Sequence, residues 1–430
     1  PLLLGAIMNR RDLLKYTGAA GALAMLARPQ SRVRASANAL KPARRVIVVM
    51  AQGGWDTTYA LDPKVQSAKV DVPVGSTQMF GDLDVFTDPS RQKVTDYFAA
   101  YGGLTAIVRG ISVTSVAHRE CVKRMATGTR SETNPDLAAI VAHDLGNDLP
   151  LPYLILGDTA FTGPFAVSAG RVGATNQIIA LLDPAQAYRD PDGTPPFTPT
   201  AAEDAILARY ANASADRLRA TRGALGYNRR RVDDFTASIE RGKRLKEVSA
   251  GFGTRGRTLA LESQVDLALD AVEQGISQAV MLNTRLQWDT HDTNTDQAGF
   301  HDATFTGLAR LLAGLTTRPG ATPGSKMIDD TTVVCFSEFS RTPKLNSQAG
   351  KDHWPVTSAM VIGAGIRGGK AYGASTDTIE PDLVNYATGA RDPNGQTVIS
   401  HNFVAGVLTA CGVDAATHLG TTEVFDAFVA

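Results

Sequence analysis

A short run of β-branched and apolar residues, 332–336, is the feature that most constrains the fold of this chain. Its sequence, TVVCF, is typical of a strand that is buried on both faces of a parallel sheet. The polar residues Glu338 and Arg341 follow directly, and Asp352 and His353 come after a glycine-containing loop. In open α/β sheets, ligands bind outside the carboxyl ends of parallel strands, so these four are candidate site residues. The alternative is that Glu338 and Arg341 form a solvated ion pair at a strand end.

Apolar runs alternate with helix-like segments along the rest of the chain. We predict further strands at 45–50, 105–108, 153–156, 279–282 and 359–362, and helices at 119–126, 136–144, 261–274 and 301–315. Strands that alternate with helices indicate an α/β fold with a doubly wound, mainly parallel sheet and helices on both faces. Residues 62–90 are rich in Asp, Pro and Gly and are interpreted as a long irregular excursion.

Residues 186–265 differ from the rest of the chain in their pattern of charged and apolar residues. Mixed charges and apolar residues at three- and four-residue spacing predict a helical insertion of two or more amphipathic helices. Within it, the basic cluster Arg229-Arg230-Arg231 is interpreted as a solvated helix face. We expect the insertion to belong to a single α/β domain of residues 40–430.

The amino-terminal region, residues 1–39, has the features of a twin-arginine export signal. Arg10 and Arg11 precede a mildly apolar segment, Tyr16 to Ala27, and small residues suited to cleavage follow at 35–39. The apolar segment is too short to span a bilayer, so no stable membrane span is expected. The protein is predicted to be periplasmic or secreted, with the twin-arginine translocase as its partner during export.

Composition narrows the remaining classes of function. Removing residues 1–37 leaves a mildly acidic chain, which gives no indication of nucleic-acid binding. The three cysteines are an odd number in apolar surroundings and are interpreted as buried thiols.

Residues 363–369 match the glycine spacing of a dinucleotide site, but residues 370–373 do not begin a helix, so turn glycines are the better interpretation. The chain has no Gly-x-Ser-x-Gly elbow and no phosphate-loop lysine motif.

Acidic and imidazole side chains gather after the predicted strands. They are Asp56 after 45–50, Asp289 and His291 after 279–282, and Glu338, Asp352 and His353 after 332–336. Carboxylate oxygen combined with imidazole nitrogen suits a divalent metal, with zinc or manganese first, iron next, and calcium less readily because it prefers oxygen alone. The alternative is a buried polar network that fixes the geometry of the loops.

Four motifs carry a resemblance to a known family: GGWD at 53–56, WDTH at 288–291, SEFSRTP at 337–343 and DHWP at 352–355. Together with the twin-arginine leader they resemble a bacterial family known as domain of unknown function 1501. This family in turn looks like a branch of the alkaline phosphatase and sulfatase superfamily. The resemblance covers nearly the whole mature chain and implies a metal centre at the strand ends, used for phosphate or sulfate ester chemistry.

The resemblance also implies roles for particular residues. Asp56 matches the first metal aspartate of the superfamily, whereas Phe339 stands where a metal-binding histidine is usual, so one of two metal positions loses a ligand. Asp289, His291 and His353 resemble the ligands of the other position.

The position of the superfamily nucleophile is also implied. Counting nine residues back from the Thr127-Gly128 pair gives His118, which can accept a phosphoryl group, bind a metal or act as a general base, but cannot form a seryl or threonyl intermediate. Thr114 or Ser115 would supply a hydroxyl in a shifted register. Arg119 and Arg341 are suited to bind an anionic substrate.

Two functions of different classes follow. The first is an exported metal-dependent hydrolase of a small anionic phosphate or sulfate ester, with His118 and Arg341 as its catalytic residues. The second is a non-hydrolytic relative that binds a metal or an exported protein partner on the same scaffold. The missing hydroxyl at His118 favours the second, and the dense polar cluster favours a working site.

Overall fold

The computed structural model describes residues 44–157, 159–171, 200–248, 260–420 and 423–430. The predicted export signal lies outside these residues, as do parts of the predicted helical insertion. Residues 42–430 cluster as one unit by their internal contacts. Among the described residues, no helix combines the length and apolar character needed to cross a bilayer.

An eight-stranded sheet forms the centre of the fold. Across the sheet, the strands are β12 (Lys370–Gly373), β4 (Thr105–Ser112), β11 (Val356–Gly363), β8 (Thr331–Phe336), β1 (Arg45–Met50), β7 (Ala279–Asn283), β5 (Tyr153–Ile155) and β6 (Ala169–Arg171). Only β11 runs antiparallel to its neighbours, β4 and β8, and the other pairs are parallel. The predicted α/β fold with a mainly parallel sheet is therefore confirmed.

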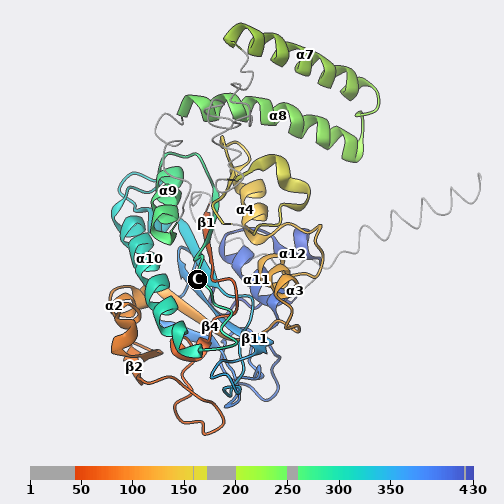
Figure 1. The fold of residues 1–430 in the computed structure, drawn as a ribbon. Coiled ribbons are helices and arrows are strands. Elements are labelled where there is room, and N and C mark those ends of the chain that lie inside the picture. Colours follow the sequence, from red (N-terminus) through yellow and green to blue (C-terminus); the bar gives the residue numbers. More distant parts are fainter. Residues whose placement is uncertain (1–43, 158, 172–199, 249–259, 421–422) are drawn as a thin grey trace, which may run out of the picture. The chain divides into compact units, whose positions relative to one another are not determined.

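Helices cover both faces of this sheet, as Figure 1 shows. Side chains alternate along β1, so Val46 and Val48 enter one apolar core while Ile47 and Val49 enter the other. The first core is covered by α3 (His118–Thr127), α4 (Leu137–Gly146), α11 (Ser400–Ala410) and α12 (Ala415–Leu419). The second is covered by α2 (Gln92–Tyr101), α9 (Leu261–Glu273) and α10 (Gln297–Thr317). A strand with two buried faces explains why the sequence of β1 is continuously apolar.

The excursion at 62–90 is more regular than the sequence indicates. It contains a hairpin of β2 (Ser76–Phe80) and β3 (Leu83–Thr87), joined at Gly81, whose φ is 64°. The turn interpretation of residues 363–369 holds: Gly363 and Gly369 have positive φ, and strand β12 follows rather than a helix.

The helical insertion is present in the part that the structure describes. α7 (Ala201–Ala220) and α8 (Gly226–Val248) form a helical hairpin. α9 confirms the helix predicted at 261–274, and it packs against α10 as part of a helix layer of the sheet.

The order of the strands positions the candidate site. β8, β1 and β7 are parallel neighbours, so the segments that follow them leave the sheet at the same edge. These segments carry the sequences GGWD, WDTH and SEFSR. Three loops that are far apart in the sequence therefore meet at one edge.

Candidate metal centre

Three parts of the chain carry the histidines and the aspartate of the site. Asp289 and His291 lie in the segment after β7, and His118 is the first residue of α3. His353 begins β10 (His353–Trp354), which pairs with β9 (Ser340–Arg341) in the segments that follow β8.

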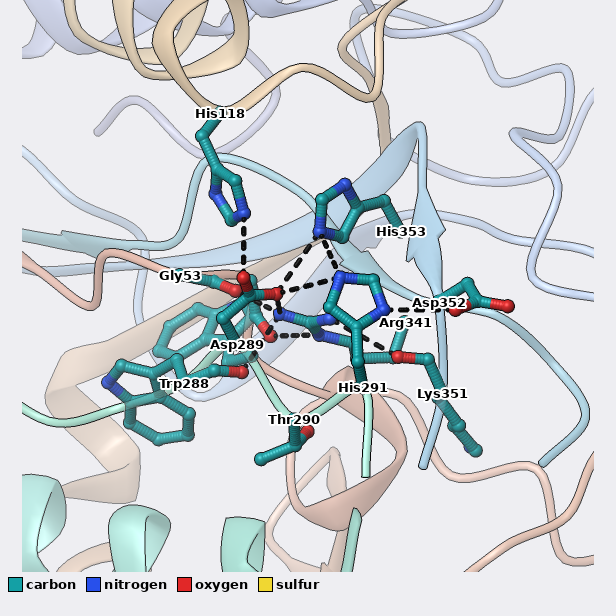
Figure 2. Close-up of polar contacts among 12 residues, drawn as sticks. Gly53, His118, Trp288, Asp289, Thr290, His291, Arg341, Lys351, Asp352 and His353 are labelled. Carbon is teal, nitrogen blue, oxygen red and sulfur yellow. Dashed lines mark hydrogen bonds and ion pairs between the residues drawn. The ribbon is translucent and has the colours of Figure 1, made fainter. Parts of the chain in front are cut away.

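The histidine side chains converge on the carboxylate of Asp289, as Figure 2 shows. His118, Asp289 and His353 each offer a ligand atom within 4.8 Å of the other two. His291 extends this group, because its Nε2 lies 3.2 Å from Asp289 Oδ1 and 2.9 Å from His353 Nε2. The four side chains form the candidate metal centre.

The outer ring nitrogen of each histidine has a hydrogen-bond acceptor. The three pairs are His118 Nδ1 with Glu338 Oε1 at 2.7 Å, His291 Nδ1 with Asp352 Oδ1 at 2.9 Å, and His353 Nδ1 with the Val116 carbonyl at 2.7 Å. Because these oxygens accept a ring N–H, each Nδ1 is assigned the proton and each Nε2 presents its lone pair inward. Metal-bound histidines in proteins are held in this way.

Two observations show that these residues fit a metal ion. The lone pairs of His291 Nε2 and His353 Nε2 face each other across 2.9 Å, which is repulsive unless a proton or a cation lies between them. The Nε2 of His118 is buried and makes no hydrogen bond within the described structure, although Asp289 Oδ2 is 3.3 Å away. Three imidazole nitrogens and one carboxylate suit zinc, manganese or iron, whereas calcium takes oxygen ligands and fits poorly.

The surroundings of Asp289, His118 and His353 shift the pKa values of these side chains in different directions. Burial alone would raise the pKa of Asp289, but the hydrogen bond from Arg341, the close contact with His353 and the positive charge of Arg341 outweigh it and hold the pKa at about 2. The hydrogen bond to Glu338 raises the pKa of His118, whereas burial lowers the pKa of His353. The carboxylate of Asp289 is therefore ionised over the whole physiological range.

Glu338 was predicted to be a metal ligand, but the structure gives it a different position. Its carboxylate is fully buried, and its oxygens accept hydrogen bonds from the Gly53 N–H at 2.9 and 3.0 Å, from Ser337 and from His118. These contacts place Glu338 behind His118, as the group that orients its ring. Asp352 stands in the same relation to His291, so both carboxylates lie in the outer layer of the site.

Asp56, also predicted to be a ligand, lies in a buried ion pair instead of the histidine cluster. Its Oδ2 is 2.7 Å from Lys351 Nζ, both side chains are fully buried, and Thr58 and Asn294 donate to the same carboxylate. Burial would raise the pKa of Asp56, but the charge of Lys351 and its hydrogen bond outweigh that effect and lower the pKa. The ammonium group therefore takes the place beside Asp56 that the sequence analysis gave to a metal ion.

Arg341 was predicted to contact the substrate, but it is buried and its donors are used within the protein. Its guanidinium donates to the carbonyls of Gly53, Gly54, Trp288 and Lys351, and to Asp289 Oδ1 at 2.8 Å. Arg341 thus ties together the loops after β1 and β7, and it fixes Asp289 in place. It is a positioning residue.

Among the described residues, neither hydroxyl proposed as an alternative nucleophile forms a hydrogen bond with the histidines. Thr114 Oγ1 accepts a hydrogen bond of 2.5 Å from Arg124, and Ser115 Oγ accepts one from the Ala117 N–H. His118, predicted as a nucleophile, a general base or a metal ligand, lies in the candidate metal centre.

An open cleft of about 460 Å³ adjoins the cluster. His118 and Asp289 form one wall of it, and Gln52, Thr159, Arg285 and Gln287 are among its other residues. Sequence reasoning missed these residues and Lys351. The cleft residues belong to no motif, and a single lysine beside Asp352 carries no sign that it is buried.

The family model described as "Protein of unknown function (DUF1501)" matches residues 43–423. The chain belongs to the DUF1501 family. A model of the twin-arginine signal sequence matches residues 8–27, so this DUF1501 protein is exported to the periplasm or secreted. No curated protein matches the sequence at the threshold applied.

Several solved structures resemble this DUF1501 protein in fold at low sequence identity. A protein of the alkaline phosphatase superfamily from Vibrio parahaemolyticus is 11% identical, with 87% of this chain and 68% of that chain covered and a TM-score of 0.38. The lipoteichoic acid synthase LtaP from Listeria monocytogenes is 9% identical, with 90% and 76% covered and a TM-score of 0.37. Alkaline phosphatase from the Antarctic bacterium TAB5 is 9% identical, with 76% and 93% covered and a TM-score of 0.32. At these values no activity is transferred from the three proteins to this chain.

Proposed function

We propose that this exported DUF1501 protein is a metal-dependent hydrolase of a phosphate or sulfate ester. His118, His291, His353 and Asp289 would hold one divalent metal ion, with zinc or manganese the best fit. The observation that carries the proposal is the inward convergence of three imidazole Nε2 atoms whose outer nitrogens are all held by acceptors. In a purely structural network, the facing lone pairs of His291 Nε2 and His353 Nε2 would repel each other and would not stabilise the loops.

A divalent metal bound here would polarise the ester and lower the pKa of a bound water to near neutrality. The residues of the chain supply the geometry. Glu338 and Asp352 fix the ring planes of His118 and His291, and Arg341 fixes Asp289. The ester would lie in the 460 Å³ cleft that His118 and Asp289 line.

The buried lysine argues for one metal ion rather than two. Lys351 Nζ already neutralises Asp56, and a second divalent cation beside it would add charge repulsion in a fully buried site. Because Thr114 and Ser115 are hydrogen-bonded elsewhere, the attack is assigned to water instead of a protein hydroxyl.

The test is a panel of phosphate monoesters, phosphate diesters and sulfate esters assayed with the exported, metal-loaded protein. We expect turnover of at least one class, and a loss of more than about 100-fold in kcat/KM for Asp289→Asn, since even outer-layer changes cost 10–100-fold. Asp377→Asn, an exposed carboxylate outside the centre, is the matched control and should keep full activity.

A second function is supported by the position of Thr114 and Ser115, whose hydroxyls bond to other groups than the cluster among the described residues. The chain would then bind a metal and an exported protein partner without hydrolysis. Metal-loaded protein that turns over no ester in the panel, while retaining its metal, would support this second function and contradict the first.

A further inference from the structure

The tip of the helical hairpin concentrates positive charge. Residues 217–231, which include the end of α7, the connection and the start of α8, contain six arginines and no acidic residue. Figure 1 shows α7 and α8 as adjacent helices joined by this short connection. The proposed ester chemistry uses none of these residues, so the tip needs its own explanation.

Within the part of the chain that the structure describes, only two of the six arginines are paired with carboxylates. Arg219 pairs with Asp216 and Asp233, and Arg229 pairs with Asp233. Arg219 also donates to Thr236, so it holds α7 against α8. The remaining four, Arg217, Arg222, Arg230 and Arg231, are exposed and make no ion pair with the described carboxylates. Their charge is available to an external partner.

Large apolar side chains are exposed between these arginines. Leu225 is 84% exposed, Tyr227 is 65% exposed and Leu218 is 44% exposed. Arg231 lies over the ring of Tyr227. Arginine, tyrosine and leucine together suit the boundary of a bilayer, where guanidinium groups contact phosphates, tyrosine lies among headgroups and leucine enters the acyl region.

We propose that the tip of the α7–α8 hairpin binds the surface of an anionic phospholipid bilayer. Charge complementarity is the main argument, because each arginine near an anionic surface adds to binding and the exposed apolar residues add a second, salt-insensitive contribution. A nucleic acid would also attract arginine, but the twin-arginine signal directs this chain out of the cytoplasm and across a membrane. The inference is independent of the proposed hydrolysis.

The test is co-sedimentation of the mature protein with vesicles of phosphatidylcholine, with and without phosphatidylglycerol. We expect binding to the anionic vesicles only, and we expect the triple variant Arg222→Glu, Arg230→Glu, Arg231→Glu to bind at least about fivefold more weakly. The matched control reverses the same number of exposed charges elsewhere, at Lys69, Arg130 and Arg367, and should bind like the unchanged protein.

A second variant separates charge from apolar contact. Leu225→Ser with Tyr227→Ser should weaken binding and make the remainder more sensitive to salt, with an unchanged circular dichroism spectrum. Equal loss in the tip and control variants, equal binding to both kinds of vesicle, or binding to DNA in preference to anionic vesicles would overturn the proposal.

Discussion

Asp289 is the residue on which the three imidazole rings converge, and its position depends on Arg341. The carboxylate is partly exposed toward the cleft, yet Arg341 holds it from the buried side at 2.8 Å. Because Arg341 also binds the carbonyls of neighbouring loops, Asp289 cannot shift without disturbing those loops. The candidate metal centre therefore has a preformed carboxylate ligand.

Asp352, the carboxylate that holds the Nδ1–H of His291, gives the first test of a single residue. Asp352→Asn would replace the acceptor that holds the N–H of His291, so we expect metal affinity to fall about 10–100-fold without loss of folding. Titration with a competing chelator measures this affinity. Asp377→Asn serves as the control, and an equal affinity in both variants would contradict the role given to Asp352.

The buried ion pair makes a separate prediction about stability. Lys351→Met would leave the carboxylate of Asp56 uncompensated in the interior, and we expect a loss of about 3–5 kcal/mol in the free energy of unfolding. Adding Asp56→Asn should recover part of that loss. Urea denaturation measures both. If Asp56→Asn alone removed bound metal from folded protein, Asp56 would be a ligand after all.

His301 predicts how stability depends on pH. It is fully buried beside Trp55 and Tyr59, and burial lowers its pKa to about 4. The unfolded chain takes up a proton at this histidine near pH 6.5 and the folded chain does not, so stability falls as the pH drops from about 6.5 to 4. The difference corresponds to roughly 3 kcal/mol.

The variant His301→Gln lacks the titrating ring and should lose this part of the pH dependence. Urea denaturation of both proteins between pH 4 and pH 7 makes the comparison. An identical slope in the two proteins would show that His301 is not responsible.

Sequence reasoning identified individual residues better than it identified their roles. The Asp289-x-His291 pair and His353 follow strands and were predicted as ligands from that placement. The positions of Asp56 and Glu338 follow from contacts that span 295 residues to Lys351 and 285 residues to Gly53. No local pattern encodes such a contact, so a ligand and the carboxylate behind a ligand look alike in the sequence.

Among the elements, the turn after β1 sets how closely the loops approach. Gly54 has a φ of 86°, and a Cβ at this position would overlap the ring of Phe339 and lie 3.0 Å from Arg341. Its N–H donates to Ser337. Gly54 of the GGWD motif therefore allows the loop after β1 to pack against the segment after β8.

Substitution at this turn tests its importance. Gly54→Ala should cost about 2–5 kcal/mol, from the left-handed backbone and from overpacking against Phe339. Gly299→Ala in α10 meets no atom within 4 Å and should be neutral or slightly stabilising. Thermal unfolding of the pair measures the contrast, and equal stability would contradict the close packing at Gly54.

The elements that sequence reasoning found and missed differ in burial. β1 and β8 are buried on both faces, which gives a continuous apolar signal. β2 is exposed along most of its length, and β12 has only four residues at the edge of the sheet, so neither shows a pattern of period two. α11 is buried almost throughout, which hides the period of 3.6 that marks an amphipathic helix.

At the scale of the whole molecule, the candidate site depends on a complete sheet, and this dependence bears on the order of folding and export. The proposed ligands come from segments after β7 and β8 and from α3, which are brought together only when the sheet is complete. The twin-arginine signal is consistent with export after folding, and hence with a metal centre formed before translocation.

The metal content of the exported protein tests the central claim most directly. Elemental analysis of the protein purified from its native compartment should give about one zinc or manganese ion per chain, as expected for one four-ligand centre. His291→Ala and His353→Ala should lose most of this metal while Asp377→Asn retains it. A folded protein without bound metal, before and after incubation with zinc and manganese, would contradict the account.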